Sequence, residues 1–371
     1  MKKILAVLLS AMIVCAASGC ASSSKSSSSK SGSSAAEESS QAETEAPHEA
    51  TAPTANPAVS PDMEDTIKSH GFEGVIYAVK DGKPTASYAS GKTENGSEIT
   101  LDTSLPIGSV SKQFCAASIL LLQEQGKLSV NDTLDKYYPD FAEGKKVSLH
   151  NLLSMRSGIP ELTAESGINV TNENTEAENV AAIKKWLFSQ PLAFEPDKDF
   201  AYTNTNYFLL SDIVEQVSGK KYIDFLRENF LAPLGMTHTG SIVELSKSPD
   251  WTQGNTFKKI DAQPGLTNGC GDLISNAADM TAWISALSSG KVISDDSYKA
   301  MTTDYSPDVH YGYGMYLNIE GGVGHYGAIG IYSAFDYVNT DKKLTLIAIS
   351  NTIDPPAMTG AAGDLLTDLM Q

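Results

Sequence analysis

A turn that leads into a long buried helix is predicted by the stretch Leu105-Pro-Ile-Gly-Ser-Val-Ser-Lys-Gln-Phe-Cys-Ala-Ala-Ser-Ile-Leu-Leu-Leu-Gln-Glu-Gln-Gly126. A proline and a glycine interrupt its beginning, dense apolar residues follow, and the final glycine suits a helix C-terminus. Ser109 and Lys112 lie three residues apart at the start of this helix, so their side chains share one face of its first turn. The stretch therefore places a hydroxyl beside an amine.

This pairing suits nucleophilic chemistry. The positive end of a helix dipole favours a developing alkoxide, and a buried lysine that loses its proton readily can serve as the base for a serine. The Ser-x-x-Lys spacing alone is not specific, but among its occurrences only Ser109 opens an apolar helix directly after a glycine. The other occurrences are Ser22/Lys25, Ser27/Lys30, Ser218/Lys221 and Ser288/Lys291.

Composition narrows the class of protein. The chain has 371 residues, of which 41% are hydrophobic, and a formal net charge of -18. Such an acidic surface repels nucleic acid and anionic lipid, so we expect neither as a partner of the folded part. The length is sufficient for about two structural units, and we expect a monomer.

The first residues indicate export. Residues 1–19 carry two lysines directly after Met1 and continue with an apolar run that is too short to span a bilayer. The segment Ala17-Ser-Gly-Cys20 resembles a bacterial lipoprotein lipobox, which implies cleavage before Cys20 and acylation of its thiol. An ordinary secretory cleavage after Ala17 or Gly19 is the alternative. We expect an extracytoplasmic protein held on the outer face of the cell membrane by this lipid.

Residues 20–61 are rich in Ser, Ala, Glu, Thr and Pro and contain no aromatic residue. A segment of this composition cannot bury enough apolar surface to offset its ordering entropy, so we expect a disordered tether. A flexible chain of this length reaches roughly 35 Å. The folded domain is then expected to occupy residues 62–371.

Strand patterns occur at both ends of this domain and helical patterns lie between them. We expect paired strands at residues 74–80 and 85–90, and further strands at 311–319, 332–338 and 344–350. This order predicts an α+β fold whose sheet part, about 62–104 and 265–371, is assembled from both chain ends and flanked by helices. The residues from about 105 to 264 would form an inserted all-helical part.

Several motifs in order resemble the serine β-lactamase and DD-peptidase superfamily. The similarity is greatest to its class C β-lactamase-like branch, which includes DD-carboxypeptidases, D-amino-acid peptidases and esterases. It runs from about residue 62 to the C-terminus and implies the β-lactamase/transpeptidase-like fold, with an antiparallel sheet, and an acyl-enzyme formed on Ser109. The matching stretches are Ile107-Gly-Ser-Val-Ser-Lys-Gln-Phe114, Leu152-Leu-Ser-Met-Arg-Ser-Gly158, Phe200-Ala-Tyr-Thr-Asn-Thr-Asn-Tyr207, Pro233-Leu-Gly-Met236 and Gly269-Cys-Gly-Asp-Leu-Ile-Ser275.

The second motif of this superfamily is Tyr-x-Asn, which Tyr202-Thr-Asn204 matches. The same spacing at Tyr316 and Tyr337 falls in expected strands near the C-terminus, whereas Tyr202 falls in a loop between helical segments. The resemblance implies that Tyr202 relays protons and that Asn204 binds the substrate's amide carbonyl and Lys112. A phenol needs a cationic neighbour for this role, because its ordinary pKa is about 10.

The third motif of the peptidase and esterase branch is His-x-Gly, which occurs at His238, His310 and His325. We choose His325-Tyr-Gly327 because it lies in a glycine-rich segment before the last two strands, where a substrate backbone can approach the strand edge. The resemblance implies that His325 and Gly327 bind substrate.

By the same resemblance, the oxyanion hole consists of the backbone N–H groups of Ser109 and Ala328. Two departures from the family pattern are notable: His325 replaces a permanent cation with a group expected to titrate near pH 6.5, and Tyr326 replaces a short hydroxyl donor. Both point away from an efficient β-lactamase and make a strict D-Ala-D-Ala carboxypeptidase less favoured.

The function expected from these residues is that of an exported serine hydrolase. Ser109 would attack an amide or ester, either in a cell-wall-type D-amino-acid peptide or in a small ester. The alternatives are a β-lactamase, or a penicillin-binding sensor with little turnover. We expect no metal and no organic cofactor, since the histidines do not cluster. Cys115 and Cys270 are more compatible with two separate thiols than with a disulfide.

Overall fold

The computed structural model describes residues 57–93, 96–162, 166–245, 263–352 and 354–371. The expected signal peptide at residues 1–19, the lipidation site Cys20 and all but the last residues of the expected tether lie outside these ranges. Within them, no helix combines the length and the apolar character needed to cross a membrane.

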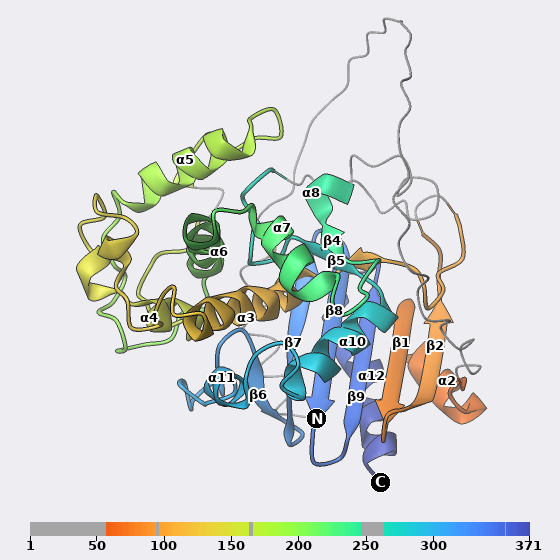
Figure 1. The fold of residues 1–371 in the computed structure, drawn as a ribbon. Coiled ribbons are helices and arrows are strands. Elements are labelled where there is room, and N and C mark those ends of the chain that lie inside the picture. The colour runs from red at the N-terminus through yellow and green to blue at the C-terminus, as the bar shows by residue number, and fades with distance from the viewer. Residues whose placement is uncertain (1–56, 94–95, 163–165, 246–262, 353) are drawn as a thin grey trace, which may run out of the picture.

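A six-stranded antiparallel sheet forms the centre of the molecule, in the order β2-β1-β9-β8-β7-β6 (Figure 1). The first and last parts of the folded chain meet in it, because β1 pairs with β9. This confirms the expected α+β fold with a sheet built from both ends. The strands are β1 (Gly74–Lys80), β2 (Lys83–Ser90), β6 (Tyr316–Ile319), β7 (Gly322–Ile329), β8 (Tyr332–Asn339) and β9 (Leu344–Ser350).

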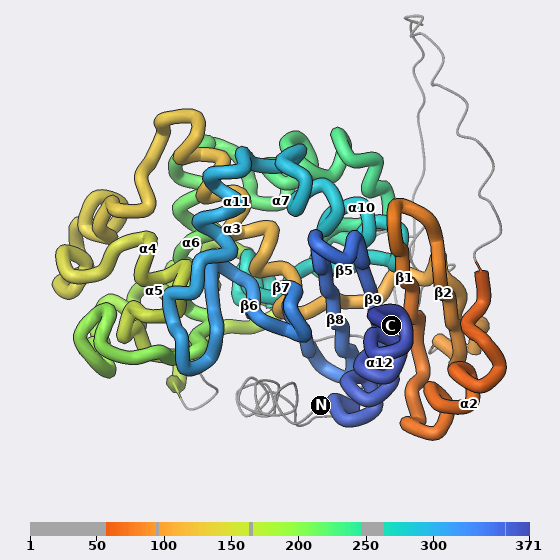
Figure 2. The backbone as a smooth tube through the Cα atoms, turned by 90° about the horizontal axis from the view of Figure 1, so that it is seen from below, coloured from red at the N-terminus to blue at the C-terminus, as the bar shows by residue number. Residues whose placement is uncertain are grey.

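Both faces of the sheet are covered by helices. Successive side chains of a strand point to opposite faces, so a strand in this sheet contributes to a core on each side. In β9, Ile347 and Ile349 join the larger core with helix α10 (Ala277–Ser288), whereas Leu346 and Ala348 join a second core with α12 (Pro355–Met370). Helix α2 (Pro61–Ser69) packs beside α12. Figure 2 shows α10 and α12 on opposite sides of the strands. The sheet is therefore the middle layer of three.

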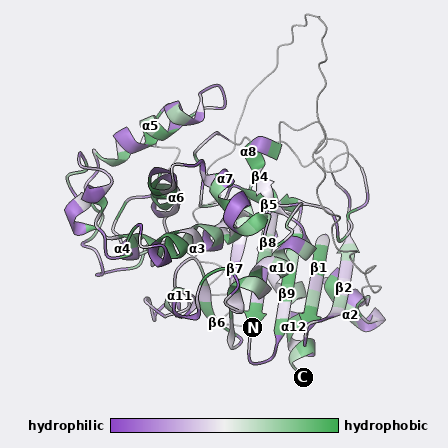
Figure 3. Ribbon diagram, in the orientation of Figure 1, coloured by the Kyte–Doolittle hydropathy of each residue, from purple (hydrophilic) through white to green (hydrophobic). Residues whose placement is uncertain are grey.

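The helical region lies beside the β6–β7 side of the sheet (Figure 1). Helix α3 (Ser111–Glu124) is its buried centre, and the ring of Phe114 stacks on Trp283 of α10 at a centroid distance of 3.7 Å. Figure 3 shows hydrophilic and hydrophobic turns alternating in the peripheral helix α5. The other helices are α4 (Leu149–Leu153), α5 (Glu176–Leu187), α6 (Asn204–Ser218), α7 (Tyr222–Leu226), α8 (Ile242–Leu245) and α11 (Asp295–Met301).

Two features differ from the expectation. The strand expected over 311–319 is regular only in β6, because Gly314 has a φ of +69° and a Cβ at Gly312 would lie 2.2 Å from the Met301 carbonyl oxygen. A small second sheet was also not predicted. It consists of β3 (Leu105–Pro106), β5 (Leu273–Ser275) and β4 (Gly240–Ser241), and it joins the start of the nucleophile segment to residues far along the chain.

Candidate active site

Ser109 lies in a single 3₁₀ turn, Gly108–Val110, and not in the α-helix itself, which begins at Ser111. Gly108 has a φ of +51°, and a Cβ there would lie 2.6 Å from the backbone nitrogen of Ala328. Only glycine permits this close approach. The tight turn therefore presents Ser109 beside strand β7.

Lys112 is completely buried, and its Nζ is the centre of the site. It donates hydrogen bonds to Ser109 Oγ at 3.0 Å, to Asn204 Oδ1 at 2.8 Å and to the Cys270 carbonyl oxygen at 2.7 Å. An ammonium group has one proton for each of these acceptors. A neutral amine could keep the bonds to Asn204 and Cys270 while it accepts the proton of Ser109. The geometry is thus that of a nucleophile–base pair.

Tyr202 is in the loop directly before α6, as the sequence indicates, and Asn204 is the first residue of that helix. The Lys112 Nζ lies 4.9 Å from the centroid of the Tyr202 ring. A cation at this distance stabilises the electron-rich ring and any phenolate formed on it. The structure therefore brings together the first two sequence motifs around one amine.

The loop that carries Tyr202 is held by hydrogen bonds to the Leu152–Gly158 stretch. The Ala201 N–H donates to the Met155 carbonyl at 3.0 Å, and the Thr203 N–H donates to Met155 Sδ at 3.4 Å. A Cβ at Gly158 would lie 2.0 Å from the Phe194 carbonyl oxygen. The Leu152–Gly158 stretch is thus a support for the Tyr202 loop.

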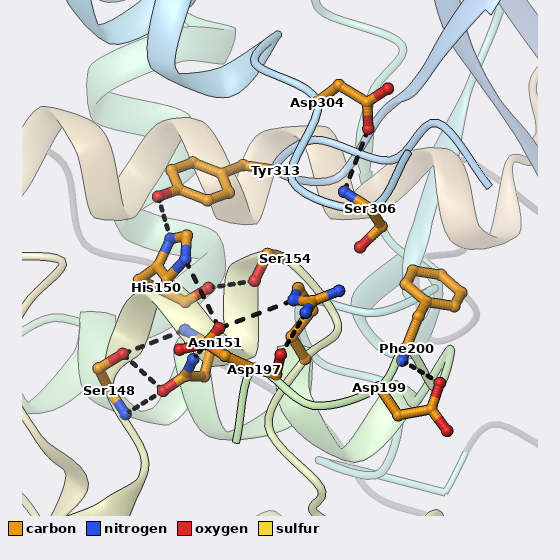
Figure 4. Close-up of polar contacts among 11 residues, drawn as sticks. Ser148, His150, Asn151, Ser154, Asp197, Asp199, Phe200, Asp304, Ser306 and Tyr313 are labelled. Carbon is orange, nitrogen blue, oxygen red and sulfur yellow. Dashed lines mark hydrogen bonds and ion pairs between the residues drawn. The ribbon is translucent and has the colours of Figure 1, made fainter. Parts of the chain in front are cut away.

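A polar cluster holds the same loop further upstream (Figure 4). Asn151 Nδ2 donates to Asp197 Oδ1 at 2.8 Å, and the Arg156 guanidinium donates to the Asp197 carbonyl. His150 Nδ1 lies 2.6 Å from the hydroxyl of Tyr313, and burial is the main cause that lowers the pKa of this histidine. The cluster connects α4 to loops on both sides of the site.

Glu161 is a residue of the site that sequence reasoning missed. Its carboxylate accepts a hydrogen bond from Asn204 Nδ2 at 2.8 Å and from the Thr205 N–H at 3.3 Å, at the start of α6. These bonds orient the Asn204 amide so that its oxygen faces Lys112. Burial raises the pKa of Glu161, against the lowering effects of Asn204, Thr205 and Lys112. The only sequence signal for Glu161 is the presence of an acidic residue shortly after Gly158.

His325 is in β7 and is completely buried. Its Nδ1 lies 2.5 Å from the Tyr326 carbonyl and therefore donates to it, and its Nε2 then accepts from the Tyr311 hydroxyl at 3.3 Å. Burial, and then the charge of Lys112, lowers the pKa of His325 to about 3. The expectation that this imidazole titrates near pH 6.5 is therefore wrong: it is neutral at physiological pH.

Tyr326 does not face the site. Alternation along β7 places its ring in the second core, on the α12 side of the sheet, where it is buried. The expectation that it stands in place of a hydroxyl donor to substrate is therefore wrong. Gly327 lies on the site's side, and a Cβ there would be 1.9 Å from the Ile107 carbonyl oxygen and 2.9 Å from the Ser109 nitrogen.

The backbones around Ser109 and Ala328 therefore pack directly against one another. Such contact is required if both N–H groups are to point at one oxyanion. Preorganised donors of this kind supply roughly 3–4 kcal/mol of transition-state stabilisation each.

Two other expectations concern cysteines and metals. Cys115 and Cys270 are separate thiols, as expected, and burial raises the pKa of Cys115 well above its ordinary value. Nearby Asp272 is fully buried, and burial raises its pKa to about 7. Within the described part of the chain, no group of histidine, cysteine and carboxylate side chains is suited to hold a metal ion.

The site and the fold together define a class of protein. The family model described as Beta-lactamase matches residues 56–369, and the chain belongs to this family. The expected superfamily is thus confirmed.

Individual relatives narrow the comparison. The chain is 28% identical over 318 residues to the putative penicillin-binding protein PbpX of Bacillus subtilis (strain 168), covering 83% of this chain and 78% of PbpX. It is 27% identical over 297 residues to a D-aminopeptidase of Brucella anthropi, covering 76% of this chain and 56% of the enzyme, so it spans only about half of that relative.

Among solved structures, the octameric penicillin-binding protein homologue of Pyrococcus abyssi superposes with a TM-score of 0.69 at 26% identity. The match covers 84% of this chain and 76% of that one. These relatives and the Ser109–Lys112 geometry support a serine hydrolase of this superfamily.

Proposed function

We propose that this protein hydrolyses an amide or ester through an acyl-enzyme on Ser109, and that its substrate is a small peptide of the cell-wall type that contains D-amino acids, or a small ester. The observation that carries the proposal is the 3.0 Å hydrogen bond between the buried Lys112 Nζ and Ser109 Oγ. The D-aminopeptidase relative supports the peptide substrate.

In acylation, neutral Lys112 takes the proton of Ser109 while Oγ attacks the carbonyl carbon. The negative charge then develops on the carbonyl oxygen, where the N–H groups of Ser109 and Ala328 stabilise it. Collapse of this intermediate breaks the C–N or C–O bond, and the leaving group takes a proton from Lys112 directly or through Tyr202. Water then repeats the sequence on the acyl-enzyme, with the same groups as base and acid.

The substrate side of the site has a neutral imidazole. With a pKa near 3, His325 supplies no cation for a substrate carboxylate at neutral pH. Binding of a free carboxylate would have to rely on other groups, so we favour amides and esters in which the acyl side, bound by Asn204, supplies the recognition. This supports the peptidase or esterase assignment over a β-lactamase.

The test is intact-mass spectrometry of the purified protein after incubation with a fluorophosphonate and, separately, with penicillin. A single adduct on Ser109 with the fluorophosphonate supports the proposal, and Ser109→Ala should remove it. A stable penicillin adduct in addition supports a peptidase-like site with slow deacylation. If folded protein forms no adduct with either reagent, the binding or sensing alternative replaces the proposal.

We also propose that the protein is exported, carries a lipid on Cys20 and is a monomer. The sequence of residues 1–20 supports export and the lipid. Metabolic labelling with an alkyne fatty acid, followed by detergent partitioning, tests the lipid. Cys20→Ser should lose both the label and the detergent-phase partitioning, and retention of the label would contradict the proposal. Light scattering of the detergent-solubilised protein tests the oligomeric state.

A further inference from the structure

A buried hydrogen-bonded bridge lies behind the site and is not part of the chemistry above. Gln113 directly follows Lys112 in α3, and its Nε2 donates to both carboxylate oxygens of Asp336, at 2.9 and 2.8 Å. The Gln113 Oε1 in turn accepts from the indole N–H of Trp283 at 3.0 Å. These three side chains are at most 1% exposed.

The bridge continues to strand β7. Asp336 is opposite His325 in the β7–β8 register, and its Oδ1 accepts the backbone N–H of His325 at 2.7 Å. Gly327 and Ala328 follow His325 in the same strand. The Asp336 carboxylate thus touches both the helix that carries Lys112 and the strand that carries an oxyanion donor.

We propose that Asp336 is a positioning residue that, through Gln113 and the His325 N–H, holds helix α3, which carries Lys112, and strand β7, which carries Ala328, in their reactive arrangement. The proposal rests on the proposed function, because it concerns the geometry between Ser109 and Ala328. A shift of about 1 Å between such groups costs on the order of 100-fold in rate.

The hydrogen-bond donors around Asp336 determine which protonation state of its carboxyl group completes the bridge. All the neighbouring groups that bond to its carboxyl group are N–H donors, so an ionised carboxylate satisfies them and a protonated acid opposes one of them. Burial raises the pKa of Asp336 to about 7. The bridge should therefore be complete above this pH and weakened below it.

Two titratable side chains near Asp336 have pKa values far from this range. His325 of β7 has a pKa of about 3, and burial raises the pKa of Tyr298 of α11 to about 12. On β9, Asp336 is opposite Ile347, which has no charge. The Nζ of Lys112, on α3, is directed to Ser109. A change of acylation rate near pH 7 that depends on Asp336 would thus report its own ionisation.

The experiment measures the rate of Ser109 modification by a fluorophosphonate from pH 5.5 to 8.5 in the full-length protein. In the wild type the rate should rise through about pH 7. Asp336→Asn imitates the protonated acid, so it should be about 10- to 100-fold slower at pH 8 and should lack the rise that depends on this group. Circular dichroism and thermal melting establish that the variant is folded.

The matched control is Asp279→Asn. Asp279 is also a buried carboxylate with a pKa raised by burial, but its partners are the His238 N–H and the Thr239 hydroxyl, away from Ser109. This variant should lose stability while it keeps the wild-type rate and pH profile. If Asp336→Asn only lowers stability in the same way, Asp336 is structural and the proposal is wrong.

A second variant keeps the test valid if Asp336→Asn does not fold. Gln113→Met has a similar length but no donor, and it should slow modification to a similar extent. In the variant that carries both Asp336→Asn and Gln113→Met, the labelling rate should be no lower than in the slower single variant. Both substitutions break the same Gln113–Asp336 hydrogen bonds. Additive losses would contradict the proposal. Absence of any labelling in the wild type would instead contradict the proposed function.

Discussion

Lys112 illustrates how a single buried charge is retained for chemistry. Three of its acceptors are one hydroxyl, one amide oxygen and one backbone carbonyl. Removing an ammonium group from water is costly, and these hydrogen bonds offset part of that cost. The hydrogen bond to Ser109 is the one that nucleophilic chemistry would use.

We predict that Lys112→Met separates activity from stability. The substitution removes the base and should reduce Ser109 modification by on the order of 10³-fold or more. It also removes a buried charge while it keeps an unbranched chain, so the melting temperature should stay level or rise. Fluorophosphonate labelling rates and differential scanning calorimetry measure the two effects. An unchanged labelling rate would show that another group deprotonates Ser109.

Glu161→Gln tests the residue that orients Asn204. The neutral amide keeps an acceptor for Asn204 Nδ2 but removes negative charge from the N-terminus of α6, where the Thr203 side chain makes no cap. We expect a loss of about 1 kcal/mol in the free energy of unfolding, measured by urea titration, and slower acylation. Asp199→Asn is the control, because the Asp199 carboxylate accepts a hydrogen bond from the adjacent Phe200 N–H rather than from Asn204. Equal effects in both variants would contradict the orienting role.

At this scale the sequence indicated which side chains lie together but not their surroundings. Two short motifs could be recognised because their spacing is local: Ser109 with Lys112, and Tyr202 with Asn204. The fold then brings the two motifs together. The neutral state of His325 and the inward direction of Tyr326 depend on the packing of β7 against distant elements. A sequence pattern does not show which ring a strand buries.

At the scale of elements, close backbone approach decides where glycine is required. Gly327→Ala places a Cβ 1.9 Å from the Ile107 carbonyl oxygen, so β7 must move away from the Ser109 turn. We expect Ser109 modification to fall by about 100-fold with the protein still folded. The measurement is the labelling rate, accompanied by a melting curve.

Gly363→Ala is the matched control for that substitution. Gly363 lies inside α12, and nothing is within 4 Å of a Cβ at this position. Alanine there should raise the free energy of unfolding by about 0.5–1 kcal/mol without any change in labelling. A comparable loss of labelling in both variants would show that the effect at Gly327 is not local.

Regular elements with a clear period were predictable, whereas short ones were not. The strands of the two chain ends and the long helices follow from their patterns. The pairs in the small sheet, such as Leu105 with Ser275, form between residues about 170 positions apart and have no local signature. The segment before β6 contains strand-forming residues, but the contact of Gly312 with Met301 bends it.

For the whole molecule, buried carboxyl groups set the dependence of stability on pH. Burial raises the pKa values of Asp272 and Asp336 from an ordinary 3.8 to about 7 in the folded state. Their favourable contribution is complete below pH 3.8 and is lost as the pH rises from there to 7, because over this range the unfolded state has released protons that the folded state still holds. His325 has the opposite effect, but only below about pH 6.5.

We therefore predict that the melting temperature falls as the pH rises from 5 to 7, because the two carboxyl groups outweigh the one histidine. Each of these two carboxyl groups contributes a slope of up to about 1.4 kcal/mol per pH unit between its unfolded and folded pKa values. Asp272→Asn should make the decrease smaller, and the same substitution at exposed Asp341 should not. Calorimetry at several pH values gives the measurement, and a melting temperature that rises over this interval would contradict the sign.

The pairing of β1 with β9 also has a consequence for the time course of folding. Val75 is opposite Ile349, so the sheet closes a loop of about 270 residues before this pair can form. Contacts of such long range are slow to form, and during synthesis they cannot form until nearly the whole chain is available. The β1–β2 hairpin therefore lacks its partner strand β9 until the rest of the chain has been synthesised. Helix α3 is synthesised long before strand β7. The site that lies between them should therefore become active only at the end of folding.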